Sequence, residues 1–156
     1  MGSNSIKIAN TITQCPSLAI PKEIAYPPID EIAFITDYKK GCTKNTLAML
    51  ISIASIADAA IRVLHINEEK TMNLNQVSNK KILKKYLTKT QHSFDDIWNY
   101  SDKINVIQDF LIQRDIKMFA MAYHRRSFFK HLLHEPAVLD LSIYTTIPFL
   151  ILPVQD

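Results

Sequence analysis

Residues 31–54 read EIAFITDYKKGCTKNTLAMLISIA, and this stretch decides the fold class. Its first six residues form an almost unbroken apolar, β-branched and aromatic run, which is typical of a parallel strand buried on both faces. A polar turn follows over residues 37–41, and Thr43 is then a suitable N-cap for a helix. Apolar residues recur after Thr43 at helical spacing, so we predict a helix over residues 43–58 that lies on a sheet.

The rest of the chain continues this alternation of strands and helices. We predict strands over residues 60–66, 93–98, 116–122 and 147–153, and helices over residues 74–89, 102–114 and 136–144. Alternation with helices of this length implies right-handed crossovers and a parallel sheet. The expected fold is therefore α/β: an open five-stranded parallel sheet with helices on both faces, of the Rossmann-like kind.

A ligand of such a sheet normally lies beyond the carboxyl ends of its strands, where the strand order switches. In this chain the switch is expected at the turns that follow the first and fourth strands of the main sheet. These turns are Thr36–Gly41 and Ala122–Ser127.

The chain has 156 residues, about the length of one domain. A group of prolines separates a short leading segment from the main domain. Pro21, Pro27 and Pro28 interrupt any helical or strand period, because proline fixes φ and removes an N–H. We therefore expect a leading segment over residues 1–21, a linker over 22–30 and a main domain over 31–156.

Composition excludes several classes of protein. Eighteen Lys and Arg against fifteen Asp and Glu give a net charge of +3, whereas dedicated nucleic-acid binders are usually strongly basic. No apolar run reaches the roughly 20 residues of a membrane span, and the first residues lack the apolar core of a secretory signal. The two cysteines make no disulfide framework, so we expect a cytoplasmic protein with free thiols. Only two glycines occur, which disfavours glycine-rich phosphate loops.

Three stretches together resemble the universal stress proteins. They are IAFITDYKKGCTKNTLAMLISIA, IRVLHINEE, and IKMFAMAYHRRSFFKHLL through IYTTIPFLILPV, and they span nearly all of residues 31–153. The leading segment is similar to the end of a preceding domain of the same kind, with a Gly-Ser pair at Gly2 and a Cys-Pro at Cys15. The chain thus resembles the second domain of a tandem stress protein.

The resemblance also indicates which ligand to expect. ATP-binding members carry Gly-x2-Gly-x9-Gly-Ser/Thr after the fourth strand, and the corresponding positions here are Ala122, Arg125, Glu135 and Pro136. Pro136 has no N–H to donate, and Glu135 places a negative charge where a phosphate would lie. The expectation is no cofactor and no ordinary ATP binding. Because Asp37 keeps the position that contacts adenosine in those members, ATP with Mg²⁺ on a degenerate phosphate loop remains the alternative.

The candidate ligand-binding residues lie on the two turns at the switch point. They are Thr36, Asp37, Ala122, His124, Arg125, Arg126 and Ser127. The two arginines could hold an oxyanion through their guanidinium groups. A solvated basic loop with inward-facing Phe128 and Phe129 is favoured over that reading.

Other chemistry is weakly supported. Three histidines (His124, His131 and His134) lack the further ligands that zinc needs, so no metal is expected. Ser127 near His124 has no nucleophile-elbow spacing, and Cys42, although placed where its pKa could be depressed, is taken as structural. No catalytic residue is assigned, and slow ATP hydrolysis is the one enzymatic alternative. Five lysines crowd one predicted helix and are interpreted as a solvated face: Lys80, Lys81, Lys84, Lys85 and Lys89.

The last strand is apolar and is expected at a sheet edge, where an exposed strand normally pairs. The resemblance implies that it is the dimerisation element, with Phe149, Leu150, Ile151, Leu152 and Pro153. Residues 17–20 could pair with residues 149–152, within one chain or between two. The predicted function is a dimerising interaction or regulatory module of the stress response, which pairs as a homodimer or with a tandem domain and has protein partners that the sequence does not identify.

Overall fold

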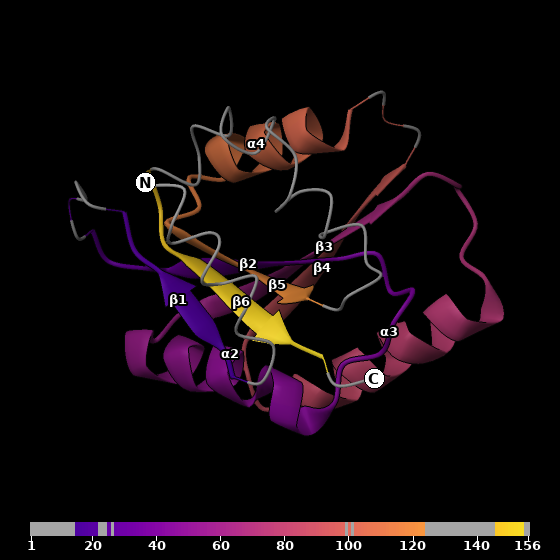
Figure 1. Cartoon of the computed structure of the whole chain (residues 1–156), viewed down its shortest axis with the longest axis horizontal. Coiled ribbons are helices and arrows are strands. Elements are labelled where there is room, and N and C mark those ends of the chain that lie inside the picture. Colours follow the sequence, from indigo (N-terminus) through magenta and orange to yellow (C-terminus); the bar gives the residue numbers. More distant parts are fainter. Residues whose placement is uncertain are drawn as a thin grey trace.

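A computed structural model describes residues 15–21, 25, 27–98, 100, 102–123 and 146–154. Within these residues the chain forms one sheet flanked by helices (Figure 1). The strands are β1 (Ser17–Ala19), β2 (Glu31–Thr36), β3 (Ala60–Asn67), β4 (His92–Trp98), β5 (Met118–Tyr123) and β6 (Phe149–Pro153). The helices are α2 (Lys44–Ala57), α3 (Leu74–Tyr86) and α4 (Lys103–Gln113).

The sheet has six strands in the order β1-β6-β5-β2-β3-β4. Strands β2 to β6 are mutually parallel, which confirms the predicted α/β class and all five predicted parallel strands. The predicted strand count was one short, because β1 from the leading segment adds to the edge of β6. The added strand is antiparallel, with Leu18 opposite Leu150, so the sheet is mixed and not wholly parallel.

The strand order switches between β2 and β5, as predicted. β2 pairs with β3 on one side and with β5 on the other, so Ile35 lies opposite both Leu64 and Met121. The carboxyl ends of these three strands therefore meet at one edge of the sheet.

Two apolar layers hold the helices to the sheet. One layer packs α4, through Ile107 and Leu111, against one face. The other packs α2 and α3, through Leu47 and Leu83, against the opposite face. Figure 1 shows α4 on one side of the sheet and α2 with α3 on the other, as the prediction of helices on both faces required.

Three predicted boundaries are corrected. The last strand, predicted over 147–153, begins only at Phe149. The helix predicted over 74–89 ends at Tyr86, and a turn closed by Thr90 N–H and the Leu87 carbonyl takes the remaining residues. The strand predicted over 116–122 begins only at Met118, because Ile116 N–H donates to the Leu111 carbonyl and thereby ends α4. The helix predicted over 136–144 lies outside the described residues.

Among the helices that the structure describes, none combines the length and the apolar character needed to cross a bilayer.

Candidate functional site

The turn after β2 is shaped by its own side chains. The hydroxyl of Thr36 accepts a hydrogen bond from Tyr38 N–H at 3.1 Å, and the Asp37 carboxylate accepts one from Lys39 N–H at 2.9 Å. Tyr38 has a left-handed backbone, with φ 56°. This left-handed backbone at Tyr38 turns the chain sharply out of the strand. The hydrogen bond from Lys39 N–H holds the Asp37 carboxylate just after β2.

Helix α3 holds the same turn from outside. Gln76 donates its amide N–H to the Asp37 carbonyl, and Asn79 donates to the Tyr38 carbonyl, both at 2.8 Å. Gln76 is itself fixed by a capping box with Asn73 at the helix start. A Cβ on Gly41 would lie 2.8 Å from Oδ1 of Asn79, so any larger residue at position 41 would require the Asn79 side chain to shift.

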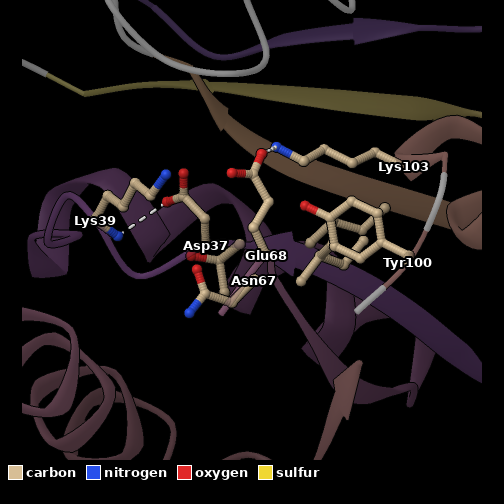
Figure 2. Close-up of a pocket in the computed structure, with 9 residues that line it drawn as sticks. Asp37, Lys39, Asn67, Glu68, Tyr100 and Lys103 are labelled. Atoms are coloured by element: carbon tan, nitrogen blue, oxygen red, sulfur yellow. Dashed lines mark hydrogen bonds and ion pairs between the residues drawn. The ribbon is translucent and has the colours of Figure 1, made fainter. Parts of the chain in front are cut away.

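A small cavity, open to solvent, lies at the carboxyl ends of β2 and β3. Its apolar floor is Ile35 and Ile66, and the start of α4 forms a wall. The lining residues are Ile35, Thr36, Asp37, Lys39, Ile66, Asn67, Glu68, Tyr100 and Lys103. Figure 2 shows their polar ends gathered around the opening.

The charges around this cavity balance. Two carboxylates, of Asp37 and Glu68, lie between the ammonium groups of Lys39 and Lys103 (Figure 2). Lys103 donates to Glu68 at 2.7 Å, and this hydrogen bond lowers the pKa of Glu68. Burial acts to lower the pKa of Lys103, but the bond to Glu68 and the adjacent Tyr100 outweigh it and raise that pKa. Such a site suits a polar ligand of low charge better than a triphosphate.

A buried aromatic and ionic cluster supports the turn from the α3 side of the sheet. The His65 ring is fully buried, stacks on Tyr38 with centroids 4.4 Å apart, and meets Trp98 edge-on at 5.3 Å. Its Nδ1 lies 2.9 Å from Asp96, which also accepts from Lys80 at 3.1 Å. Burial lowers the pKa of His65, and the neighbouring Lys80 adds to that effect against the opposing influence of Asp96.

The structure brings part of the predicted site together. Thr36 ends β2, Asp37 follows it, and both line the cavity. Ala122 is buried near the end of β5, beside the end of β2. The remaining four candidates lie outside the described residues, as do Glu135 and Pro136: His124, Arg125, Arg126 and Ser127.

Sequence reasoning missed the second half of the cavity. Asn67 ends β3 and Glu68 follows it, whereas Tyr100 lies between β4 and α4 and Lys103 is the first residue of α4. The signal was available, because the rule that ligands lie beyond the carboxyl ends of strands applies to these turns as well. The ion pair of Glu68 with Lys103 joins residues 35 apart in the sequence, a separation that no local pattern reveals.

Other predicted chemistry can be placed only in part. Within the described residues no three His, Cys, Asp or Glu side chains gather as a metal site, and the histidines considered for zinc lie outside them. Burial raises the pKa of Cys42 to about 12, with a contribution from Asp37, so its thiol stays protonated. The suggestion of a depressed Cys42 pKa was therefore wrong, whereas its structural role fits. Lys80 pairs with Asp96, while the other four lysines of the stripe are exposed.

Comparison with known proteins identifies the fold. No protein-family model matches the sequence, and no curated protein matches it significantly. Solved universal stress protein structures do match in shape. One from Archaeoglobus fulgidus has a TM-score of 0.55 at 13% identity, covering 79% of this chain and 93% of that one.

Two further structures of the same family contain nucleotides. The universal stress protein from Archaeoglobus fulgidus in complex with dAMP has a TM-score of 0.53 at 11% identity and covers 81% of this chain and 99% of that one. A universal stress protein in complex with cAMP has a TM-score of 0.55 at 10% identity, with coverage of 83% and 100%. The chain therefore has the universal stress protein fold, as the sequence resemblance predicted.

Proposed function

We propose that this chain is a universal-stress-protein-like regulatory module that acts through pairing of its last strand and not through ATP. The observation that carries the proposal is the edge of the sheet. Four of the five residues of β6 are buried, and its outer edge is hydrogen-bonded to β1. An apolar strand at the edge of a sheet has unpaired N–H and C=O groups, so it tends to bind another strand.

Strand β1 comes from the segment that resembles the end of a preceding domain. The β1–β6 pair is the arrangement expected if the last strand of one such domain covers that of the next. A homodimer through the predicted residues 149–153 would need β1 to move or to be exchanged, because both edges of β6 are occupied. Tandem pairing is therefore the form of the proposal that the structure favours.

A disulfide cross-link tests the pairing. Leu18 and Leu150 are directly opposite, and opposed Cα atoms of an antiparallel pair lie about 4.5–5.5 Å apart, within disulfide range. In a Cys15→Ser background, Leu18→Cys with Leu150→Cys should oxidise readily. A locked monomer on a non-reducing gel means pairing within the chain, and a covalent dimer means exchange between chains.

The register gives a matched control. Leu18→Cys with Leu152→Cys moves one thiol by two residues, to about 7–8 Å for a diagonal pair, so it should oxidise much more slowly. If the Leu18–Leu150 pair forms no cross-link, or forms it no faster than the control, the pairing proposal fails.

Calorimetry with ATP and Mg²⁺ tests the second half of the proposal. We expect no binding in the micromolar range, because the positions that correspond to the phosphate-loop glycines are Ala122, Arg125 and Glu135 and the cavity carries balanced charges. Micromolar binding would overturn it.

We assign no catalytic role. A cytoplasmic location belongs to the same proposal, in keeping with the free thiols of Cys15 and Cys42.

A second candidate function is binding of an adenine nucleotide on a degenerate phosphate loop. It is favoured by the cavity beside Asp37 and by the two fold neighbours solved with dAMP and cAMP. Titration with adenosine, AMP and ATP–Mg²⁺ separates recognition of the nucleoside from recognition of phosphate.

The variant Asp37→Asn sharpens that titration. Its side chain can still accept from Lys39 N–H and keep the turn, but it carries no charge. If the nucleoside binds beside Asp37, the variant should bind it at least tenfold more weakly. Equal affinity would place the ligand elsewhere.

A further inference from the structure

Strand β4 has a free outer edge. It is the last strand in the sheet order, and among the residues that the structure describes no strand pairs with its outer side. Its seven residues include no proline and no lysine, and none of them is fully buried. Edge strands are ordinarily protected by such residues or by being short, as β1 is, with three residues between Pro16 and Pro21. The β4 edge is therefore open to pairing.

The backbone of β4 presents a regular row of hydrogen-bonding groups at this edge. Ile61 N–H donates to the Gln91 carbonyl at 2.8 Å, so Gln91 and every second residue after it bond to β3. The residues between them direct their N–H and C=O groups outward: His92, Phe94, Asp96 and Trp98. Groups that recur at every second residue of a strand match an extended chain, and they do not match a compact ligand.

The acidic residues of β4 are neutralised by cations of the chain itself. Asp96 accepts from Lys80 at 3.1 Å. Asp95 accepts from Arg62 at 3.4 Å and from Arg114 at 3.3 Å. Because each carboxylate already has a cationic partner, neither leaves an unpaired negative charge that would repel an anion at this edge.

Helix α3 adds unpaired positive charge beside β4. Lys80 contacts Asp96 and lies 5.7 Å from the centre of the Phe94 ring, so its flank of α3 faces β4. Lys84 follows at i+4 and shares that flank. Because α3 crosses back over the sheet between β3 and β4, Lys84 lies toward the amino end of β4. In the part of the chain that the structure describes, four lysines of α3 and the turn after it are exposed and form no ion pair: Lys81, Lys84, Lys85 and Lys89.

We propose that the β4 edge binds an extended acidic peptide segment as an added strand. The backbone of β4 supplies the pairing, and carboxylates on the α3 side of the partner meet Lys84 and the lysines beside it. Side chains of an added strand alternate between the two faces of the sheet, so the acidic residues of the partner recur at every second position. This inference goes beyond the proposed function, because it concerns the edge of the sheet opposite to β1 and β6.

The same features disfavour two other occupants. A second copy paired through β4 about a two-fold axis would bring the lysines of both α3 helices to the same face of a joined sheet, where like charges repel. A nucleic-acid strand would meet the lysines, but it would leave the outward N–H and C=O groups of β4 without partners. An acidic peptide satisfies both the charge and the backbone.

Fluorescence anisotropy with a labelled peptide tests the proposal. The probe alternates glutamate and threonine and matches β4 in length. We expect saturable binding to the full chain with a dissociation constant below about 1 mM. Binding should be at least tenfold weaker when alternate amides of the peptide are N-methylated, because those groups can no longer donate. A single-stranded oligodeoxythymidine of equal charge should also bind at least tenfold more weakly.

Lys84→Glu tests the charge beside the edge. It should weaken binding of the peptide by about threefold or more. Lys44→Glu is the matched control, because it reverses the charge of an exposed lysine at the start of α2, and it should leave the affinity nearly unchanged. A thermal melt of each variant shows that it is folded.

Hydrogen exchange locates the bound peptide. The outward N–H groups of His92, Phe94 and Asp96 should exchange quickly in the free chain and become protected in the complex. Those of Ser93 and Asp95, which bond to β3, should be protected in both. The proposal is overturned by no saturable binding, by equal binding of the N-methylated peptide or the oligonucleotide, by equal weakening in the two lysine variants, or by protection that changes at β1 and β6 instead of β4.

Discussion

His65 is a titratable side chain in a place that disfavours its charge. It is fully buried between Tyr38 and Trp98, and its Nδ1 lies beside Asp96. Burial lowers its pKa from the ordinary 6.5. The imidazole is therefore neutral in the folded chain under conditions in which the unfolded chain would already bind a proton.

This gives a pH dependence with a definite sign. Because the unfolded state binds the proton more readily, the contribution of His65 to stability is complete above its unfolded pKa of 6.5 and is lost as pH falls below it. The slope reaches at most about 1.4 kcal/mol per pH unit for one proton. Urea midpoints between pH 8 and pH 5 measure it.

The control is His65→Phe, which keeps the stacked ring and removes the titration, while Asp96 keeps its partner Lys80. Its stability should change less between pH 8 and pH 5 than that of the wild type. Parallel pH profiles of the two proteins would show that His65 does not titrate in this window.

Individual caps were predictable from sequence, and distant partners were not. Thr43 was expected as an N-cap and is one, because a cap depends only on the next three residues. The position of Asp37 after β2 was also expected. Its neighbour Glu68 was not assigned to the site, because its place depends on the pairing of β2 with β3.

At the scale of the element, helix α2 ends on a strained residue. Asp58 adopts the left-handed conformation, with φ 53°, while its N–H bonds back to the last helical turn. Glycine adopts this conformation without a Cβ clash. Asp58→Gly should therefore stabilise the protein by about 0.5–1 kcal/mol, measured by urea unfolding. Asp58→Asn, which also tolerates this conformation, should be nearly neutral, and a destabilised Asp58→Gly would contradict the account.

Another element-scale feature ties three neighbouring strands together through ion pairs. Arg62 of β3 bonds to Glu31 of β2 and to Asp95 of β4, and Arg114 after α4 also reaches Asp95. Hydrogen bonding to Arg62 lowers the pKa of Glu31. These side chains are only partly exposed, so their ion pairs help to hold β2, β3 and β4 in register.

Arg62→Met keeps most of the side chain's bulk and removes the hydrogen bonds to both Glu31 and Asp95. We expect a loss of about 1–2 kcal/mol in unfolding free energy, since two half-buried carboxylates lose a partner. Arg114→Met removes the more exposed partner of Asp95, and it should lower the unfolding free energy by less than half as much. Equal losses of unfolding free energy would contradict the claim that Arg62 stabilises the sheet more than Arg114 does.

Element types followed from periodicity, because buried parallel strands and amphipathic helices have distinct patterns. Strand β4 was weakly marked, since it lies at an edge and carries Asp95 and Asp96. Strand β1 was expected to pair, but the sequence left open whether within or between chains. That choice depends on the path of residues 22–30, which no local pattern determines.

At the scale of the whole molecule, charge is unevenly distributed. Lys81, Lys84, Lys85 and Lys89 are exposed on and after α3, and in the part of the chain that the structure describes they take part in none of the ion pairs. With a net charge of +3, two copies repel each other weakly at long range. Salt screens that repulsion.

Trp98 is the one tryptophan of the chain. Because it contacts His65 edge-on, its fluorescence should respond to the protonation of that histidine. A protonated imidazole quenches indole emission more strongly than a neutral one. Intrinsic fluorescence excited at the indole band therefore reports a single location, the carboxyl ends of β3 and β4, without any added dye. Acidification should dim this emission before the chain unfolds, so the same cuvette can follow both proton uptake at His65 and loss of the native core.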